Sequence, residues 1–177
     1  MILFISDLHL CASRPETTAA FRRFLDGPAR QAQALWILGD LFEFWVGDDD
    51  LHDPFHAEIA EALAGLARSG ISLHLLPGNR DFLLGKTFAR RTGANLATEP
   101  VLLEAFGLRL VLTHGDAECT QDLAYQHFRR RIRSPWCRAF LRCLPLGLRR
   151  VLAKRMRERS EASHKASNAY AYDLDPQ

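Results

Sequence analysis

The sequence predicts an α/β domain of the layered α+β type, followed by a basic helical segment. Short apolar runs alternate with amphipathic helical patterns as far as His114, which is typical of layered α/β domains. Beyond His114 only helical patterns occur, and most of the positive charge gathers there. With 177 residues and 47% hydrophobic content, the chain can bury one core and still carry an appendage.

Four apolar runs are rich in Ile, Leu, Val and Trp and are too short to form independent helices, so we expect strands. They are "ILFIS" at 2–6, "ALWIL" at 34–38, "ISLHLL" at 71–76 and "LRLVLT" at 108–113. Two amphipathic helices are expected between them, at 17–26 and at 56–68, with Gly70 marking the end of the second.

The helical part is expected in three pieces, at 122–133, at 135–144 and in a basic run from Pro145 through Arg159. Residues 129–159 hold 12 Arg and Lys against one acid, a net charge of +11, whereas the rest of the chain has a net charge of −9. Such a segment suits an anionic surface. Ordinary solvated helices and a nucleic-acid-binding segment fit the charge equally well.

Apolar side chains recur at helical spacing in this basic part. Trp136, Phe140 and Leu144 share one side of the expected helix, and Arg138 and Arg142 lie on another. This arrangement resembles a helix that lies in a membrane interface.

Composition limits the compartment and the chemistry. No signal-peptide-like leader and no run of 18 apolar residues is present, so we expect a cytoplasmic protein. Four cysteines, Cys11, Cys119, Cys137 and Cys143, show no C-x-x-C spacing, so we expect free thiols and no zinc-thiolate site.

Polar side chains with metal-ligating groups follow each expected strand. In α/β sheets the carboxyl ends of strands are where ligands bind, so these side chains are expected to converge. They are Asp7 and His9 after the first run, Asp40 after the second, Asn79 and Arg80 after the third, and His114 after the fourth. Carboxylate, amide and imidazole ligands without thiolate suit a hard to borderline divalent ion.

Each of these residues has a structural alternative. Asp40 could be a turn residue, Asn79 an Asx turn and His114 a buried, hydrogen-bonded histidine, but four such coincidences at four strand ends favour a metal site. Asp7 and His9 are two residues apart, so both would point to one side if the extended conformation persisted.

The motifs D-x-H, G-D-x-x-E, G-N-R-D and H-G-D, in this order, resemble those of the calcineurin-like metallophosphoesterases. Longer strings, such as "LGDLFEFWVGDDD", "GNRDFLLGKTFA" and "RMRERS", resemble the UDP-2,3-diacylglucosamine hydrolases of bacterial lipid A synthesis. The resemblance implies a sandwich of two β-sheets flanked by helices. It divides the chain into a core at 1–120, a basic helical, lipid-binding insertion at 121–165 and a return segment at 166–177 toward C-terminal strands absent from this sequence.

The resemblance also implies a site with two Mn²⁺ ions. Asp7 and His9 would bind the first ion, Asp40 would bridge both, and Asn79 and His114 would bind the second. The implied catalytic residues are Asp40, Asn79, Arg80 and His114, and the implied substrate-binding residues are Asn79, Arg80, Asp122, Ser160 and His164. Position 167 departs from the family, because Ser167 stands where relatives commonly have lysine, with Lys165 nearby.

The implied reaction is hydrolysis of the pyrophosphate bond of UDP-2,3-diacylglucosamine to UMP and 2,3-diacylglucosamine 1-phosphate. The implied location is the cytoplasmic face of the bacterial inner membrane, with the anionic membrane surface and the lipid substrate as partners, and with neither a nucleic-acid partner nor an oligomer implied. The family's later G-H-T-H motif does not occur in the 177 residues, so we expect impaired activity for this chain. Two alternatives stay open: a metallophosphoesterase of soluble nucleotides, and a non-catalytic membrane-binding fragment.

Overall fold

The computed structural model of the chain describes residues 1–158. The expectations for Ser160, His164, Lys165, Ser167 and the return segment 166–177 therefore lie outside the described residues. The strands are β1 (Ile2–Ile5), β2 (Ala34–Leu38), β3 (Ser72–Leu76), β4 (Asn95–Leu96), β5 (Val101–Ala105) and β6 (Leu108–Leu112). The helices are α1 (Pro15–Asp26), α2 (Pro54–Arg68), α3 (Lys86–Thr92), α4 (Leu123–Ile132) and α5 (Pro135–Cys143), with 3₁₀ turns at Pro28–Gln31 and Asp48–His52.

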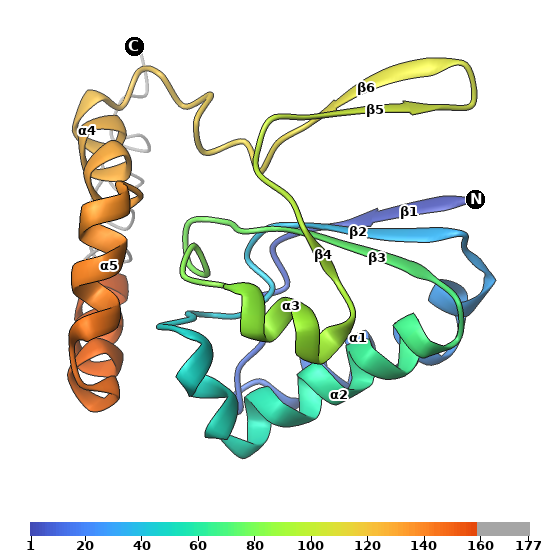
Figure 1. The fold of residues 1–177 in the computed structure, drawn as a ribbon, viewed down its shortest axis with the longest axis horizontal. Helices are drawn as coiled ribbons and strands as arrows, with labels where there is room; N and C mark the ends of the chain where they lie inside the picture. The colour runs from blue at the N-terminus through green and yellow to red at the C-terminus, as the bar shows by residue number, and fades with distance from the viewer. Residues whose placement is uncertain (159–177) are drawn as a thin grey trace, which may run out of the picture.

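Two sheets form a layered core. The first is parallel, in the order β1-β2-β3-β4, and its register places Phe4 beside Trp36 and Trp36 beside His74. The second is the antiparallel hairpin β5–β6. Figure 1 shows α1, α2 and α3 on one face of the parallel sheet and the hairpin on the other. The expected sandwich of sheets flanked by helices is confirmed.

Alternation along the central strands explains this layering, because successive side chains of a strand point to opposite faces. Leu35 and Ile37 of β2 are fully buried in the cluster that α1, α2 and α3 cover. Trp36, between them, belongs to a smaller cluster with Leu112 of the hairpin. A strand buried on both faces reads as a continuous apolar run, as "ALWIL" does.

The four expected strands are present within one residue of their expected bounds. Both expected helices start two residues earlier than predicted, at Pro15 and Pro54, where the fixed φ of proline favours the first helical turn. Asp53 adds an N-cap, since its side chain accepts a hydrogen bond from the backbone N–H of Phe55 at 3.0 Å. The helix α3 and the strands β4 and β5 were not predicted, because seven, two and five residues give too little periodicity.

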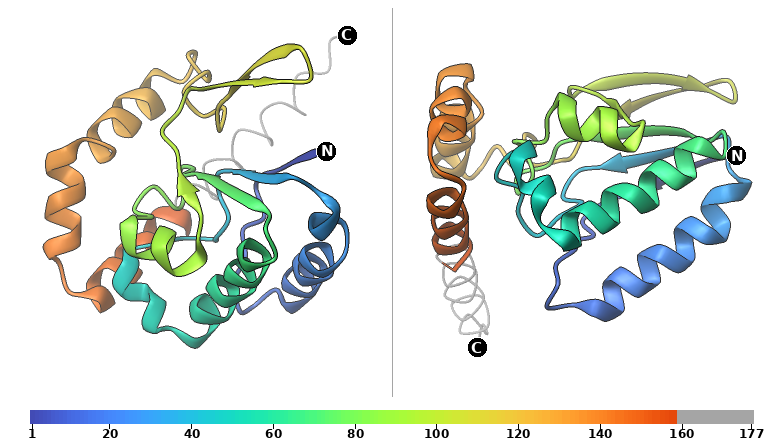
Figure 2. Two further views of the ribbon diagram at one scale, coloured as in Figure 1. Left: turned by 45° about the vertical axis from the view of Figure 1, so that its right-hand side comes forward. Right: turned by 60° about the horizontal axis from the view of Figure 1, so that its bottom comes forward.

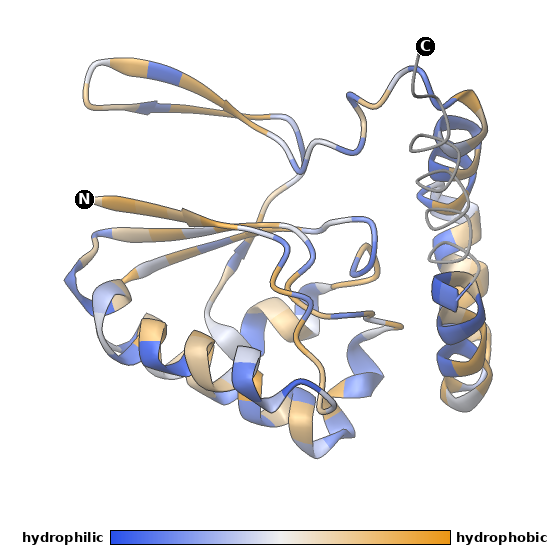
Figure 3. Ribbon diagram, turned by 180° about the vertical axis from the view of Figure 1, so that it is seen from behind, coloured by the Kyte–Doolittle hydropathy of each residue, from blue (hydrophilic) through white to orange (hydrophobic). Residues whose placement is uncertain are grey.

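The third part of the molecule, called here the helical segment, comprises α4, α5 and the helical residues 146–158. It stands beside the layered core and faces the carboxyl ends of β1, β2 and β3, as Figures 1 and 2 show. Asp122 and Ser134 cap the N-termini of its first two helices. Figure 3 shows hydrophobic and hydrophilic residues interleaved along it. Among the described residues, no helix has the length and hydropathy needed to cross a membrane.

Candidate metal centre

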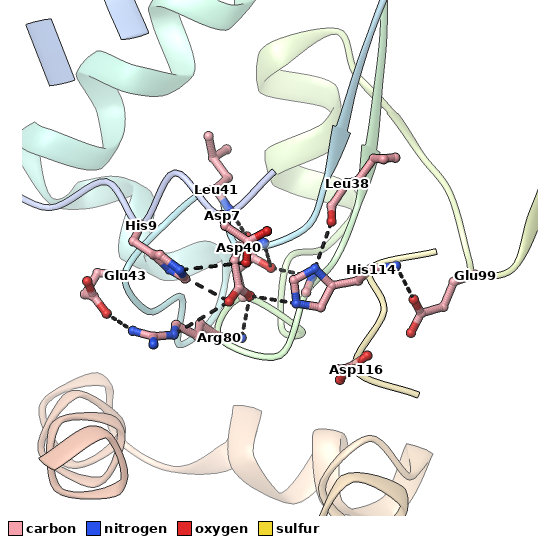
Figure 4. Close-up of polar contacts among 12 residues, drawn as sticks. Asp7, His9, Leu38, Asp40, Leu41, Glu43, Arg80, Glu99, His114 and Asp116 are labelled. Atoms are coloured by element: carbon pink, nitrogen blue, oxygen red, sulfur yellow. Dashed lines mark hydrogen bonds and ion pairs between the residues drawn. The ribbon is translucent and has the colours of Figure 1, made fainter. Parts of the chain in front are cut away.

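Side chains from three strand ends meet at the edge of the core that faces the helical segment (Figure 4). Asp7 follows β1, Asp40 follows β2 and His114 follows β6. One ligand atom from each of these residues lies within 4.8 Å of the other two. The expected convergence of Asp7, Asp40 and His114 is thus present in the structure.

Backbone hydrogen bonds connect the loops that carry these side chains. The N–H of Asp7 donates to the carbonyl oxygen of Gly39 at 3.1 Å, and the N–H of His9 donates to that of Asp40 at 2.9 Å. The N–H of Arg80 donates to Oδ1 of Asp40 at 2.9 Å, so the loop after β3 is tied to the same carboxylate. The ligand positions are therefore fixed relative to one another by the main chain.

The local conformation differs from the expected one. Asp7 and His9 have φ of 54° and 48°, and Asp40 has φ of 54°, so none of them continues an extended strand. Left-handed backbone at a residue other than glycine costs about 1–3 kcal/mol, and such residues cluster at functional sites. The extended conformation under which Asp7 and His9 would point to one side therefore does not persist, although the two side chains still lie 3.9 Å apart.

The spacing of the polar atoms suits coordination better than hydrogen bonding. Asp7 Oδ1 lies 3.9 Å from His9 Nε2, His9 Nδ1 lies 3.8 Å from Asp40 Oδ2, and Asp40 Oδ1 lies 3.7 Å from His114 Nε2. Hydrogen bonds between such atoms would be about 2.7–3.2 Å long. Two ligands bound to one ion at about 2.1 Å each lie roughly 3–4 Å apart.

A hydrogen bond to the backbone of β2 orients the imidazole ring of His114. Its Nδ1 lies 2.8 Å from the carbonyl oxygen of Leu38, which can only accept, so Nδ1 carries the proton. Its Nε2 then presents a lone pair toward Asp40, as a metal-binding imidazole requires. The backbone N–H of His114 donates to Oε2 of Glu99 at 2.9 Å.

His9 also has the protonation state of a ligand. Burial, and then the positive charge of Arg80, lower the pKa of His9 to about 4, so its imidazole is neutral at pH 7. Its Nδ1 is buried and has no hydrogen-bond partner within residues 1–158. A buried polar atom without a partner costs free energy, and a bound ion would satisfy it.

Asp40 and Asp81 are buried carboxyl groups, and both accept backbone hydrogen bonds from the loop after β3. Burial raises the pKa of Asp40. Burial and the nearby charge of Asp40 raise the pKa of Asp81 to about 7. Asp81 accepts hydrogen bonds from the backbone N–H groups of Gly78 at 2.6 Å and Leu41 at 2.8 Å, so it joins the loops after β2 and β3. Asp81 is the last residue of the G-N-R-D motif, and the motif alone does not predict this joining role.

Two glycines make room for the centre. A Cβ at Gly39, whose φ is 96°, would lie 2.4 Å from Nδ1 of His114. A Cβ at Gly78 would lie 2.2 Å from Oδ1 of Asp40. Any side chain at either position would displace a candidate ligand.

Glu43 gathers three arginines beside the centre. It is 7% exposed, and it forms ion pairs with Arg14, Arg80 and Arg157. Arg80 also lies 3.6 Å from Asp40 Oδ2, measured from its Nε. Glu43 therefore positions Arg80 at the edge of the centre. It is the acid of the G-D-x-x-E motif, and its role was missed because its partners are far away in the sequence.

A second group of ion pairs attaches α4 to the His114 loop. Arg129 Nε donates to Oδ2 of Asp116 at 2.8 Å, and Arg133 Nη1 donates to Oε1 of Glu99 at 3.0 Å. Tyr125 donates its hydroxyl to Asp116 Oδ2 at 3.0 Å, and burial raises the pKa of Tyr125 to about 12. These contacts place the helical segment against the strand ends.

The remaining site residues lie around this group. Asn79 is exposed and lines the same cavity as Tyr125. Asp122 is exposed, and its side chain accepts a hydrogen bond from the N–H of Tyr125 at 2.9 Å. The structure thus gives Asp122 a capping role.

A cavity of about 280 Å³ opens between the core loops and the helical segment. Asn79, Arg80 and Glu43 lie at its polar part. Its other walls are mainly apolar and come from both sides: Phe44, Trp45, Val46, Phe82 and Leu83 from the core, and Phe128, Ile132, Leu141, Leu152, Ala153 and Met156 from the helical segment. One cavity therefore joins Glu43, Asn79 and Arg80 to mainly apolar walls from the core and the helical segment.

Residues 1–153 match the family model described as calcineurin-like phosphoesterase. The chain belongs to this family. The phosphoesterase is also similar to three curated relatives, each named "UDP-2,3-diacylglucosamine hydrolase". It is 48% identical to that of Aeromonas hydrophila over 98% of this chain and 72% of the relative. It is 47% identical to that of Escherichia coli O81 over 98% and 72%, and 52% identical to that of Ralstonia nicotianae over 94% and 62%.

Among solved structures, a Pseudomonas putida nuclease aligns with a TM-score of 0.44 and 23% identity, over 57% of this chain and 49% of its own. The family assignment rests on the sequence matches. A calcineurin-like phosphoesterase uses a divalent metal, and the residues present fit one, because the candidate set Asp7, Asp40 and His114 combines two carboxylates with a correctly oriented imidazole.

Proposed function

We propose that this phosphoesterase hydrolyses the pyrophosphate bond of UDP-2,3-diacylglucosamine with Mn²⁺, releasing UMP and 2,3-diacylglucosamine 1-phosphate in lipid A synthesis. The observation that carries the proposal is the cavity, in which Asn79 and Arg80 adjoin mainly apolar walls. The names of the relatives that match over 98% of this chain support it. A soluble nucleotide would leave the apolar walls without a ligand.

The proposed ligand roles are those that the resemblance to the metallophosphoesterases implies. Asp7 and His9 hold one ion, Asn79 and His114 hold a second, and Asp40 bridges them with its two carboxylate oxygens. Support comes from Asp40, whose Oδ2 faces His9 and whose Oδ1 faces His114. Bound ions at this position would supply Lewis-acid polarisation of the phosphoryl group and an activated water molecule.

Arg80 is the proposed phosphate clamp. Its guanidinium is planar and carries paired N–H donors, which match the oxygens of a phosphate group. Glu43 and Asp40 hold it on either side, so little conformational entropy would be lost when a phosphate binds. We assign Asn79, Arg80 and Asp122 to the substrate headgroup, because Asn79 and Arg80 line the cavity at its polar part and Asp122 starts the adjoining helix.

The apolar chamber would enclose acyl chains. Each buried CH₂ group contributes about 0.8 kcal/mol, so a few enclosed carbons suffice to favour acylated over deacylated substrate. The chamber has one wall from the core and one from the helical segment, so the segment is proposed to act as a lipid-binding cap on the core. The expected core at 1–120 and the expected insertion beginning at 121 agree with a cap that covers a core.

The helical segment is also the proposed contact with the cytoplasmic face of the inner membrane. On α5, Trp136 is 87% exposed and Phe140 is 63% exposed. Arg131, Lys154 and Arg155 add exposed positive charge on the same segment. Amphipathic helices of this kind bind anionic membrane surfaces.

Some arginines of the basic run pair with the core and cannot contact a membrane. The interpretation of the run as one basic surface is corrected accordingly. Arg149 is 5% exposed, and it donates to the carbonyl oxygen of Val46 and pairs with Asp49. Arg150 donates its Nε to Asp50 Oδ1 at 2.8 Å. Both arginines attach the helical segment to the core, so part of the +11 charge is neutralised within the fold.

The proposed function is tested by comparing substrates with the purified protein. We expect Mn²⁺-dependent release of UMP from UDP-2,3-diacylglucosamine and much slower release from the same compound without its acyl chains. Binding of 2,3-diacylglucosamine 1-phosphate, measured by calorimetry, gives a readout that does not depend on turnover. Equal rates and affinities for acylated and deacylated compounds would reject the lipid assignment and favour a soluble nucleotide. Binding of two Mn²⁺ ions per chain would exclude a non-catalytic fragment.

A further inference from the structure

A second cavity, of about 570 Å³, lies between α5 and the core loops that precede α3 and the 3₁₀ turn at Asp48–His52. Six of its lining residues are charged: Asp48, Asp49, Lys86, Arg138, Arg142 and Arg149. Of these six, only Arg149 also lines the cavity beside the candidate metal centre. This second cavity is therefore distinct from the proposed active site.

Both acids of the cavity already have partners. Asp48 accepts hydrogen bonds from the backbone N–H groups of Gly85 at 2.9 Å and Thr87 at 2.8 Å. Asp49 is paired with Arg149. Neither acid forms an ion pair with the remaining three cations within residues 1–158, so the positive charge of the cavity is not compensated by its own walls.

Three cations in this cavity have no side-chain partner among residues 1–158. Arg138 Nε is buried and forms no hydrogen bond within residues 1–158. Burial and repulsion by Arg142 and Arg133 lower the pKa of Arg138, so its charge is held in an unfavourable environment. Lys86 and Arg142 form neither a hydrogen bond nor an ion pair in the described part of the chain. A bound anion would relieve all three.

Two of these charges lie on the face of α5 that lines the cavity. Arg138 and Arg142 are four residues apart and share one face of the helix, whereas Trp136 and Phe140 lie half a turn away and are exposed. Leu141 packs against the core and holds the helix in place. The half-buried Arg138 and the exposed Arg142 thus line the same cavity as the exposed Lys86.

We propose that Lys86, Arg138 and Arg142 form a binding site for a phosphate group outside the active site. Two guanidinium groups supply paired N–H donors, and an ammonium group adds a compact charge, which together match the oxygens of a phosphate. The phosphate belongs either to the headgroup of an anionic phospholipid or to a soluble phosphorylated compound. The site does not depend on the proposed lipid substrate.

The test uses two variants that each remove two positive charges. Arg138→Gln/Arg142→Gln removes the cavity arginines, whereas Arg130→Gln/Arg131→Gln removes exposed arginines of α4 that line neither cavity. Binding of inorganic phosphate is measured by calorimetry without Mn²⁺, at a fixed salt concentration. Binding to phosphatidylglycerol and to phosphatidylcholine vesicles is measured by sedimentation.

We expect the cavity variant to lose at least tenfold in affinity for inorganic phosphate, for phosphatidylglycerol vesicles, or for both, while the α4 variant stays within twofold of wild type for phosphate. A loss confined to inorganic phosphate assigns the site to a soluble compound, and a loss confined to vesicles assigns it to a lipid headgroup. Lys86→Gln, a single change at an exposed position, checks the result without disturbing α5. Equal affinities of the two double variants in both assays would overturn the proposal.

Discussion

Nδ1 of His114 lies 2.8 Å from the carbonyl oxygen of Leu38, the last residue of β2. This contact joins His114, which follows β6 of the second sheet, to the end of β2 in the first sheet. It occupies Nδ1 and leaves Nε2 of the ring available to a metal ion. Gly39 comes next in the chain, and its missing side chain leaves the space that the His114 ring occupies. The orientation of one candidate ligand therefore depends on a glycine 75 positions earlier.

Gly39→Ala should remove metal binding by displacing His114. Both Gly39 and Gly70 have positive φ, at 96° and 93°, so alanine at either position carries a similar backbone strain of about 1–2 kcal/mol. Only the Cβ at position 39 meets a ligand, because nothing lies within 4 Å of a Cβ at position 70.

Gly70→Ala is therefore the matched control. We expect a larger loss of thermal stability in Gly39→Ala than in Gly70→Ala, because a Cβ at position 39 also meets the Cα of Gly78 at 2.8 Å, and a loss of Mn²⁺ affinity of at least tenfold only in Gly39→Ala, measured by calorimetry. Equal Mn²⁺ affinities in the two variants would show that His114 is not a ligand.

Asp40→Asn should abolish activity while preserving the fold. Asparagine tolerates the left-handed conformation that Asp40 adopts, so the backbone can stay in place. Removal of the proposed bridging charge weakens binding of both ions, and we expect hydrolysis to fall by about a thousandfold or more.

The measurement is UMP release together with Mn²⁺ stoichiometry, and Asp26→Asn serves as the control because its side chain is 76% exposed on α1. Activity of Asp40→Asn within about tenfold of wild type would remove Asp40 from the bridging role.

Glu43→Gln should reduce turnover through Arg80. The amide keeps the shape of the side chain but loses the charge that holds Arg80, so the guanidinium loses its fixed position. We expect a fall in kcat of roughly tenfold to a hundredfold with intact Mn²⁺ binding, since positioning of a phosphate clamp contributes a few kcal/mol.

Glu58→Gln is the control, because Glu58 forms an exposed ion pair with Arg22 far from the centre. A loss of Mn²⁺ binding in Glu43→Gln would contradict the positioning role and indicate damage to the metal centre itself.

Arg149→Met should loosen the attachment of the helical segment. The substitution leaves the carbonyl oxygens of Val46 and Leu144 without a donor, which costs about 2 kcal/mol. For a chain of this size that corresponds to a fall in Tm of roughly 4–8 °C. Arg131→Met, at an exposed position of α4, should change Tm by much less. A change in Tm no larger than that of the control would show that Arg149 does not secure the segment.

The same attachment has a pH dependence of known sign. The hydrogen bond from Arg149 holds the pKa of Asp49 below its usual range. A depressed carboxyl pKa gives stability that is present above the unfolded value of about 3.9 and is lost as the pH falls through the folded value. The difference in Tm between wild type and Arg149→Met should therefore become smaller as the pH falls below about 3.9 and Asp49 is protonated. A difference in Tm that stays constant down to strongly acid pH would show that the Arg149–Asp49 ion pair does not contribute to stability.

The sequence by itself determined the four apolar strands and the candidate metal ligands that follow them. Apolar runs such as "ALWIL" can only be satisfied by burial on both faces, and a turn must follow a short strand, so Asp40 and His114 could be placed at strand ends before any contact was known. The short α3 and β4 could not be found in this way, since their formation depends on packing against α2 and β3.

Only the tertiary structure decided how the residues at these ends act on one another. Glu43 and Arg157 are 114 positions apart, and Arg149 reaches Asp49 across 100 positions, so no local pattern could reveal either pair. The left-handed conformation of Asp7 and His9 is held by hydrogen bonds from their N–H groups to the loop after β2, and local preference opposes it. Strand periodicity reports which side chains are buried, whereas ion pairs and backbone strain depend on which distant segments meet.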